Sequence, residues 1–274
     1  MINEPLTISS DNLSLAWGQA FLHIVKHAGK PLAPLLISIG CADNGDCRED
    51  APIRQALDDC LENSGNQGVQ SVANTIFPMI YWKLAKGDRQ QLYQIYRNNS
   101  SRIKALAKTK NHRGLYFERL ITFGPRAYGG NQLEHIITEF NVQRGVRTSM
   151  LQAAIFDPER DHVRTARLGF PCLQHISFVP DRKKRLLALN AFYATQQIFQ
   201  KAYGNYLGLC RLGSFMAGEM GLTFARLNCF VGVEKFDERS KYKSVIGSLT
   251  NVVEESLHQA FFYNTEQNQH GTTQ

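Results

Sequence analysis

The segment from Tyr206 to Met220 restricts the fold more than any other, because it is long, helical in pattern and nearly free of charge. Small and large apolar residues dominate it, and Arg211 and Glu219 are its only charged residues. A helix that is apolar on all sides has to be buried, so other layers of structure must surround it. We therefore predict a long internal helix here.

Strand-like segments lie on both sides of this helix in the sequence. Charged turns with Asp157-Pro158 and Pro180-Asp181 separate some of them. The predicted strands are Ser149–Phe156, Leu173–Val179, Arg185–Tyr193 and Leu222–Val233. Strands grouped around one helix predict an α+β fold with a mixed β-sheet, a long buried helix and surrounding helices.

The first half of the chain is mainly helical in pattern. Apolar residues recur at helical spacing over Leu13–Val25 and over Val69–Leu84, where Pro78 should end or kink the helix. Leu35–Ile39 is strand-like, and a polar loop from Cys41 to Asp50 follows it. Further helices are predicted over Arg89–Lys110, from Asn131 through Phe140, and over Val245–Phe262.

The length and composition favour one domain. The chain has 274 residues, of which 43% are hydrophobic and 20% charged, which allows a large core. We predict a single domain over residues 1–274, with a polar, flexible tail over 264–274. Apolar runs are too short to span a bilayer and no signal-peptide pattern is present, so we expect a soluble cytoplasmic protein with no membrane partner.

The six cysteines are irregularly spaced, and a chain of this size needs no covalent cross-links, so we expect reduced thiols. Cys210 and Cys229 look structural. Neither a C-x-x-C pair nor an H-E-x-x-H motif occurs, and we therefore expect no metal site.

The formal net charge of +7 is consistent with an anionic ligand. Lysines and arginines are spread along the chain instead of forming one block. Phosphate on a small molecule explains this as well as nucleic acid does, and a merely basic surface remains a third explanation.

The region around Phe170-Pro171-Cys172 and onward to Gly221 resembles the thymidylate synthase and pyrimidine nucleotide hydroxymethylase superfamily. Members of that family carry a Pro-Cys nucleophile on a strand and an Asn on the buried helix that follows. The stretch Asn205–Ala217 (NYLGLCRLGSFMA) keeps the spacing from this Asn to the end of the helix. The turn Gly124–Gly130 is similar to the family's Gly-Pro-x-Tyr-Gly turn, and Asn131-Gln132-Leu133 to its Asp-Gln-Leu helix start.

The resemblance implies roles for two residues above all. Cys172 would add to C6 of a pyrimidine, because a thiolate is a soft nucleophile that can also leave again. Asn205 would pair with the O4 and N3–H edge of a uracil-like ring, since its amide both donates and accepts. The alternatives are a buried structural thiol for Cys172 and a helix-capping role for Asn205.

The sequence departs from the family at its anion and cofactor positions. The family's phosphate-binding arginine before the long helix falls in Tyr193-Ala194-Thr195, where only the Thr195 hydroxyl can serve. Arg144 and Arg147 lie near the family's phosphate-binding arginines, or are simply solvated. Gln197 replaces the Asp that helps to hold folate, and Tyr128 in the family-like turn is a further candidate for cofactor binding.

Other family positions are lost. The His-x-Tyr pair for the sugar falls at Gly232-Val233-Glu234. The general-acid Glu would lie near Asn74 or Thr75, with Glu62 and Glu118 as possible substitutes.

The resemblance implies a homodimeric transferase that moves a methyl or hydroxymethyl group from 5,10-methylenetetrahydrofolate to C5 of a pyrimidine. The departures from the family indicate that it is not a standard thymidylate synthase. A second hypothesis is a nucleotide- or metabolite-binding protein that kept the fold and lost the reaction. An RNA-binding relative is the third, but no stacked-aromatic motif supports it, so we expect no nucleic-acid partner.

Overall fold

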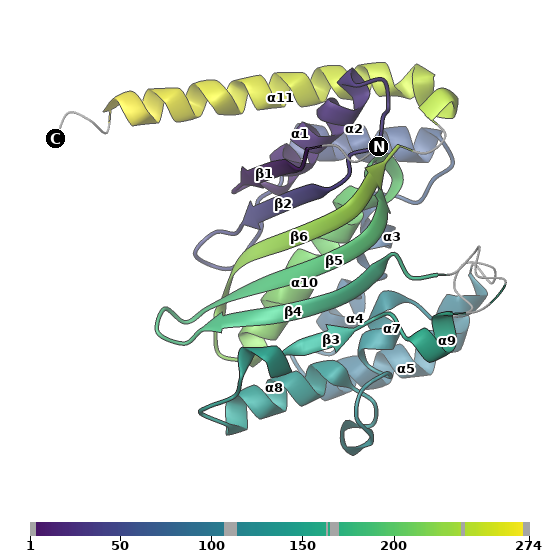
Figure 1. Ribbon diagram of the computed structural model, residues 1–274, viewed down its shortest axis with the longest axis vertical. Coiled ribbons are helices and arrows are strands. Elements are labelled where there is room, and N and C mark those ends of the chain that lie inside the picture. Colours follow the sequence, from purple (N-terminus) through teal and green to yellow (C-terminus); the bar gives the residue numbers. More distant parts are fainter. Residues whose placement is uncertain (1–3, 107–113, 163, 165–169, 237–238, 271–274) are drawn as a thin grey trace.

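A six-stranded mixed β-sheet organises the chain, with strands in the order β1-β2-β6-β5-β4-β3 (Figure 1). The computed structural model describes residues 4–106, 114–162, 164, 170–236 and 239–270. The β1–β2 and β5–β6 pairs are parallel, and the other pairs are antiparallel. The strands are β1 Leu6–Ser10, β2 Leu35–Gly40, β3 Gln152–Ala154, β4 Leu173–Asp181, β5 Leu186–Gln197 and β6 Thr223–Lys235. The predicted α+β class is confirmed.

Helix α10 (Tyr203–Glu219) connects β5 to β6 and is the long internal helix that the sequence predicts. A π-helical turn, η3 (Ile198–Ala202), leads into it from β5. Figure 1 shows α10 crossing behind the sheet, and nearly all of its residues are buried. A parallel pair of strands needs such a crossover connection, and here the connection forms the core.

Glycines let α10 approach its neighbours closely. A Cβ atom on Gly204 would lie 2.6 Å from Val72 Cβ, and one on Gly208 would lie 2.7 Å from the Ala73 carbonyl oxygen. Val72 and Ala73 both belong to α3 (Val69–Ala73). Because contacts this short exclude any side chain, the helix and α3 pack at backbone distance.

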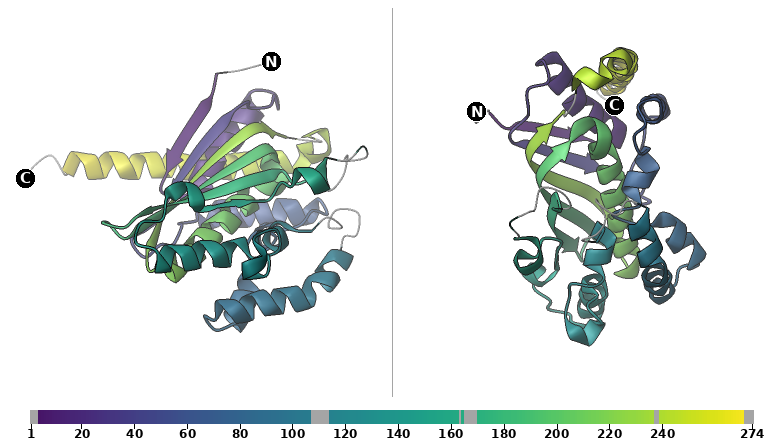
Figure 2. Two further views of the ribbon diagram at one scale, coloured as in Figure 1. Left: turned by 60° about the horizontal axis from the view of Figure 1, so that its bottom comes forward. Right: turned by 90° about the vertical axis from the view of Figure 1, so that its right-hand side faces the viewer.

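The remaining helices gather on the α10 side of the sheet and around its two ends, as the two views in Figure 2 show. They are α1 Leu13–Lys26, α2 Ala51–Asn63, α4 Met79–Leu84, α5 Arg89–Ala105, α7 Tyr116–Leu120, α8 Gln132–Val142, α9 Pro158–Asp161 and α11 Lys243–His270, with short 3-10 turns η1 Arg126–Tyr128, η2 Thr148–Met150 and η4 Arg239–Tyr242.

Local sequence signals set several helix boundaries. Asn12 caps α1 by accepting from the Ser14 and Leu15 backbone N–H groups. Pro78 is the residue before α4, so the predicted helix over Val69–Leu84 is divided into α3 and α4. Asn131 caps α8, and its side chain accepts from the Glu134 N–H at 3.0 Å.

Other boundaries differ from prediction. The strand expected over Ser149–Phe156 shrinks to β3, because the 3-10 turn η2 occupies its first part. Helix α11 runs through His270, so the expected loose tail is helical up to that residue, and 271–274 lie outside the described residues. Residues 107–110 of the predicted helix over Arg89–Lys110 also lie outside them.

The sheet face turned away from α10 carries two rows of side chains, which we call the outer face. One row is apolar and runs Leu36, Phe230, Phe192 across β2, β6 and β5, with the two Phe rings stacked at 5.6 Å between centroids. The second row is a hydrogen-bonded polar ladder across four strands: Ser38, Asn228, Asn190 and Ser177. The three apolar side chains are 37–40% exposed.

Cys41 and Cys47 form a disulfide, which corrects the expectation that all six cysteines are reduced. Both lie in the loop after β2, where the Ala42 N–H donates to the Asp46 carbonyl oxygen at 2.9 Å. This tight turn folds the loop back on itself and places the two thiols side by side. A cysteine count could not reveal a local pair of this kind.

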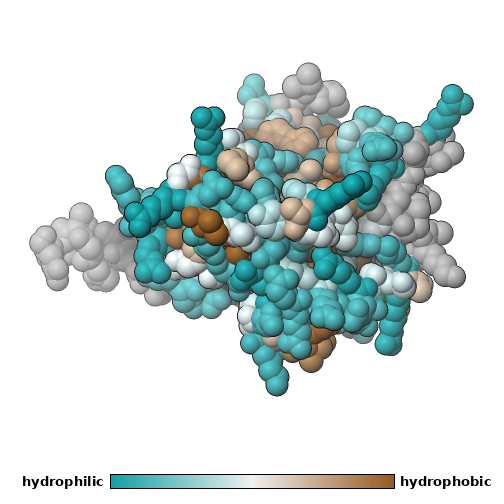
Figure 3. Space-filling view, turned by 90° about the horizontal axis from the view of Figure 1, so that it is seen from below, coloured by the Kyte–Doolittle hydropathy of each residue, from teal (hydrophilic) through white to brown (hydrophobic). Residues whose placement is uncertain are grey.

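In the parts of the chain that the structure describes, no helix is both long and apolar enough to cross a bilayer. Seen from below in Figure 3, the molecule is mostly hydrophilic, with apolar residues in separate spots.

Replacing Gly208 with Ala tests the packing of α10. The added Cβ would overlap the Ala73 carbonyl, so we expect a loss of about 1–3 kcal/mol in the free energy of unfolding, measured by urea denaturation. The matched control is Gly247→Ala on α11, where a Cβ would meet nothing within 4 Å. That change should stabilise by about 0.5–1 kcal/mol. Equal effects at both positions would contradict the packing argument.

Candidate functional site

Cys172 lies at the end of the sheet where β5 and β6 finish and β4 begins. Because β5 and β6 are parallel and β4 runs against β5, two strand ends and one strand start meet there. The Cys172 carbonyl accepts a hydrogen bond from the Ala194 N–H at 3.1 Å. We call this region the Cys172 end of the sheet.

The Cys172 thiol is half-buried. Burial raises its pKa, while the positive charges of Lys235 and Lys201 oppose that rise. Tyr116 lies beside it with its hydroxyl near the backbone of Cys172 and Leu173, and burial raises the pKa of Tyr116 as well. At pH 7 the thiol is mostly neutral, so a bound ligand or a base has to assist its deprotonation.

Asn205 lies in the first turn of α10 and is 5% exposed. It does not cap the helix, because the residue before the helix is Ala202 and no side chain makes a capping hydrogen bond. The capping alternative is therefore wrong. An amide buried at this depth is expensive unless it is hydrogen-bonded.

Thr195 and Gln197 lie near the end of β5, beside Val233 and Lys235 of β6. Both are half-buried. Thr195 follows Ala194, which bonds to Cys172, so the strand pairing brings its hydroxyl to the same end of the sheet. Of the residues singled out in the sequence, Cys172, Thr195 and Gln197 lie at this end of the sheet, and Asn205 follows on α10, just after the turn η3 that leaves β5.

Arg144 and Arg147 lie elsewhere in the chain. Both are exposed on the segment between α8 and β3. The Arg182 guanidinium, just after β4, donates to the carbonyl of Gln143 at 3.2 Å and fixes this segment near the β4–β5 turn. That turn is at the opposite end of β4 from Cys172, so within one chain these arginines do not join the thiol.

Tyr128 is also separate from the Cys172 end of the sheet. Its hydroxyl donates to Glu139 of α8 at 2.6 Å, and its ring lies 4.9 Å from that of His135. The turn that carries it depends on Gly130 at φ 81°, where a Cβ would meet the Thr122 carbonyl. Tyr128 therefore closes the turn against α8.

Buried polar groups that the sequence interpretation missed lie at the ends of β5 and β6. Among the described residues, polar side-chain atoms of Tyr193, Gln196, Tyr206 and Glu234 are buried without a hydrogen-bond partner. Gln196 and Glu234 are direct neighbours in the β5–β6 pair. Unsatisfied buried groups are rare and costly, so a cluster of four indicates a place prepared for a polar ligand or for water.

Glu234 is the most unusual member of this cluster, because it is fully buried. Burial raises its pKa well above the ordinary value. The Tyr206 hydroxyl and the Lys235 backbone N–H oppose this shift, although neither makes a hydrogen bond of normal geometry with the carboxylate. A Glu kept protonated can donate a proton or a hydrogen bond near neutral pH.

The substitutes for the general acid considered from the sequence lie in other surroundings. Glu118 pairs with Lys104 at 2.5 Å, and Glu62 is exposed at the end of α2. Glu234 was among the positions that the sequence analysis regarded as lost for ligand binding. The sequence did contain one indication that Glu234 is buried: it is a lone Glu at the end of a long apolar strand.

The Cys172 end of the sheet thus combines a half-buried thiol, two nearby cations and a buried carboxyl group whose pKa is raised by burial. Neither a protein-family model nor a curated protein sequence matches the chain.

Proposed function

We propose that the protein is a thymidylate synthase-like transferase that adds a one-carbon unit, methyl or hydroxymethyl, to C5 of a pyrimidine nucleotide or related pyrimidine. The observation that supports this best is that the Cys172 thiol and the buried Glu234 carboxyl group lie at the same end of the sheet, with Asn205 at the start of the helix that follows β5. Along the chain, the strand that follows Cys172 precedes the buried helix that carries Asn205, which is the order that the resemblance implies.

Cys172 is the proposed nucleophile. Its sulfur adds to C6, and the electrons of the C5–C6 double bond move toward C5 and O4, which makes C5 nucleophilic. Lys201 and Lys235 stabilise the thiolate form, because each positive charge lowers the pKa of the thiol. They oppose the burial that would otherwise keep the thiol protonated.

Asn205 orients the ring and Glu234 handles the proton at O4. The amide of Asn205 pairs with the O4 and N3–H edge of a uracil-like base. Glu234, held neutral by burial, supplies a hydrogen bond or a proton to O4 as negative charge develops there. In this proposal Glu234 takes the part that the family assigns to a Glu on an early helix.

The anion and cofactor contacts are also assigned to this end. Lys201, Lys235 and the Thr195 hydroxyl would bind a phosphate in place of the lost arginine. Gln197 would hydrogen-bond to a folate, and its half-buried amide at the strand end suits a ring with both donors and acceptors. When bound, 5,10-methylenetetrahydrofolate would supply the one-carbon unit.

By the same resemblance we propose a homodimer in which the outer faces of two sheets pack together. The apolar row of Leu36, Phe230 and Phe192 would supply the contact. The polar ladder can be buried there at little cost, because its groups already hydrogen-bond to one another. In such a dimer Arg144 and Arg147 could serve only the partner's site.

The second candidate is a cytoplasmic binding protein that kept the pyrimidine site and lost the reaction. The observation that favours it is the raised pKa of the Cys172 thiol, which leaves little thiolate at neutral pH. The two candidates differ in whether Cys172 forms a covalent bond with the ligand.

Intact-protein mass spectrometry with 5-fluoro-dUMP, 5-fluoro-UMP and their nucleosides, each with and without methylenetetrahydrofolate, separates the two. We expect a folate-dependent covalent adduct that is lost in Cys172→Ala and kept in Cys60→Ala, whose thiol is buried on α2. Glu234→Gln should slow adduct formation by about 10²-fold or more. Equal non-covalent binding by wild type and Cys172→Ala, with no adduct, would instead support the binding protein.

The pH dependence of stability tests the burial of Glu234. Its pKa is higher in the folded state than in the unfolded state, so above about pH 4.3 the folded state holds a proton that the unfolded state has lost. Stability should then fall as pH rises, by at most about 1.4 kcal/mol per pH unit. Glu234→Gln should remove this decline, so its stability relative to wild type should grow between pH 5 and pH 8 in urea unfolding experiments. The exposed Glu255→Gln should show no such trend.

Light scattering after size exclusion tests the outer face. Phe230→Asp places a charge within the stacked aromatic row and should convert a dimer to a monomer, because an unpaired charge cannot be buried cheaply. The control is Met150→Asp, a comparably exposed apolar residue outside the sheet face, at 42% against 40% for Phe230. A wild-type monomer, or a dimer that survives Phe230→Asp, would argue against this interface.

A further inference from the structure

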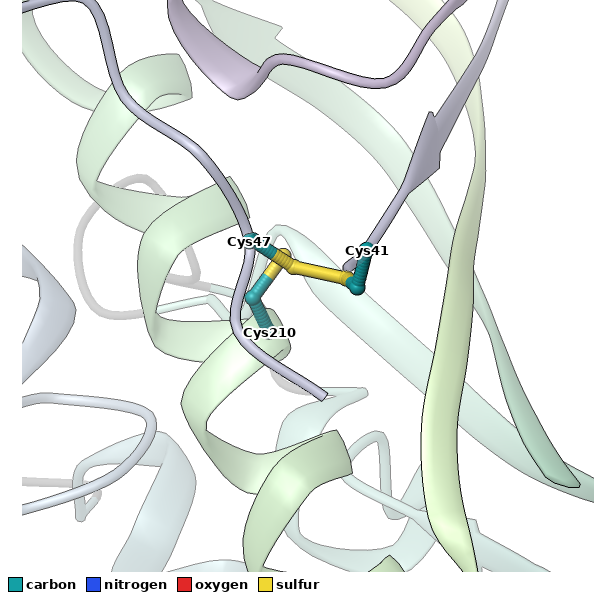
Figure 4. A group of neighbouring side chains, drawn as sticks. All are labelled: Cys41, Cys47 and Cys210. Atoms are coloured by element: carbon teal, nitrogen blue, oxygen red, sulfur yellow. A yellow bond between two sulfur atoms is a disulfide. The ribbon is translucent and has the colours of Figure 1, made fainter. Parts of the chain in front are cut away.

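Three cysteines meet where the loop after β2 approaches α10. Cys41 follows β2, Cys47 lies later in the same loop, and Cys210 lies on α10 (Figure 4). Their sulfur atoms all lie within 4.8 Å of one another, with Cys41 and Cys47 half-buried and Cys210 buried. We call them the cysteine cluster.

The loop is held against α10 by contacts that do not involve the disulfide. The Cys41 N–H donates to the Ala225 carbonyl of β6 at 2.9 Å, and the Ser214 hydroxyl donates to the Gly45 carbonyl at 2.9 Å. Ser214 is one turn along α10 from Cys210. These hydrogen bonds anchor both the start and the middle of the loop, so the three sulfur atoms should stay together after the disulfide is reduced.

We propose that reduction of the Cys41–Cys47 disulfide creates a zinc site in which Cys41, Cys47 and Cys210 are the protein ligands. A dithiol reductant supplies two electrons and two protons, which gives two thiols and an oxidised dithiol. Zinc then binds three thiolates and releases three protons, one from each cysteine. This site goes beyond the proposed function and does not depend on it.

The geometry suits zinc. With Zn–S bonds of about 2.3 Å, two sulfurs in a tetrahedral site lie about 3.8 Å apart. The sulfurs of the cluster are at most 4.8 Å apart, so small side-chain rotations are enough to reach that spacing. Three thiolates favour a soft or borderline cation such as zinc over magnesium or calcium.

In the proposed site, water fills the fourth position. The charge of Glu49 acts on Cys210, but the Glu49 carboxylate is already bound by Arg54 at 2.6 Å and by the Tyr203 hydroxyl at 2.8 Å. Cys41 and Cys47 reach the surface, so a cation can enter from their side. The site therefore has three protein ligands and one open position.

The test is an anaerobic titration of the full chain with Zn²⁺ after phosphine reduction, with Co²⁺ as the spectroscopic probe. We expect about one metal ion per chain, with sulfur-to-cobalt charge-transfer bands and tetrahedral d–d bands. Cys210→Ser should weaken zinc binding by at least about tenfold. The oxidised wild type should bind no zinc, and Cys60→Ser should bind it as the reduced wild type does.

A second measurement covers the case in which Cys210→Ser fails to fold. Zinc should protect Cys41, Cys47 and Cys210 of the reduced wild type from alkylation, as mapped by peptide mass spectrometry, and should leave Cys172 reactive. Metal binding that persists in a folded Cys210→Ser variant, protection of other cysteines, or no binding by the folded, reduced wild type would each overturn the proposal.

Discussion

The contact between α10 and α3 is the constraint on which the rest of the molecule depends. Gly204 and Gly208 allow two backbones to touch, and this sets how far α10 lies from the elements around it. Asn205 lies between these glycines, so its position relative to the Cys172 end of the sheet follows from the same contact. A side chain at either glycine would move the helix and the residues at its start together. The proposed chemistry is in this sense a product of backbone packing.

Features with a local cause could be predicted from the sequence. The near absence of charge over Tyr206–Met220 indicated a buried helix, and α10 is that helix. Pro78 divided a helical pattern where it should, and Asn131 began a helix. Helix α2 was missed although its signal was present, since Asp50 caps it by accepting from the Ile53 N–H. Strand β1 is short, and in the described part of the chain it pairs with its parallel neighbour β2. Its own residues therefore give little indication of a strand.

Features with a distant cause could not be predicted. Glu234 is fully buried, and its backbone pairs through two hydrogen bonds with Leu32, which is far away in the sequence. Cys210 looks structural from its own neighbourhood, and only the return of the loop after β2 brings it to Cys41 and Cys47. Arg144 and Arg147 resembled family residues by position, yet Arg182 holds their segment near the other end of β4. Each case depends on a long-range contact, which residue types and spacing alone do not specify.

The polar ladder on the outer face fixes the alignment of four strands. Each of Ser38, Asn228, Asn190 and Ser177 finds its partner only when all four strands stand in one register. A slip of one residue in any strand would break a link and also turn apolar core residues to the opposite face. Slipped sheets therefore lose two kinds of interaction at once, so the ladder selects one arrangement of the sheet from the many that its apolar residues would tolerate.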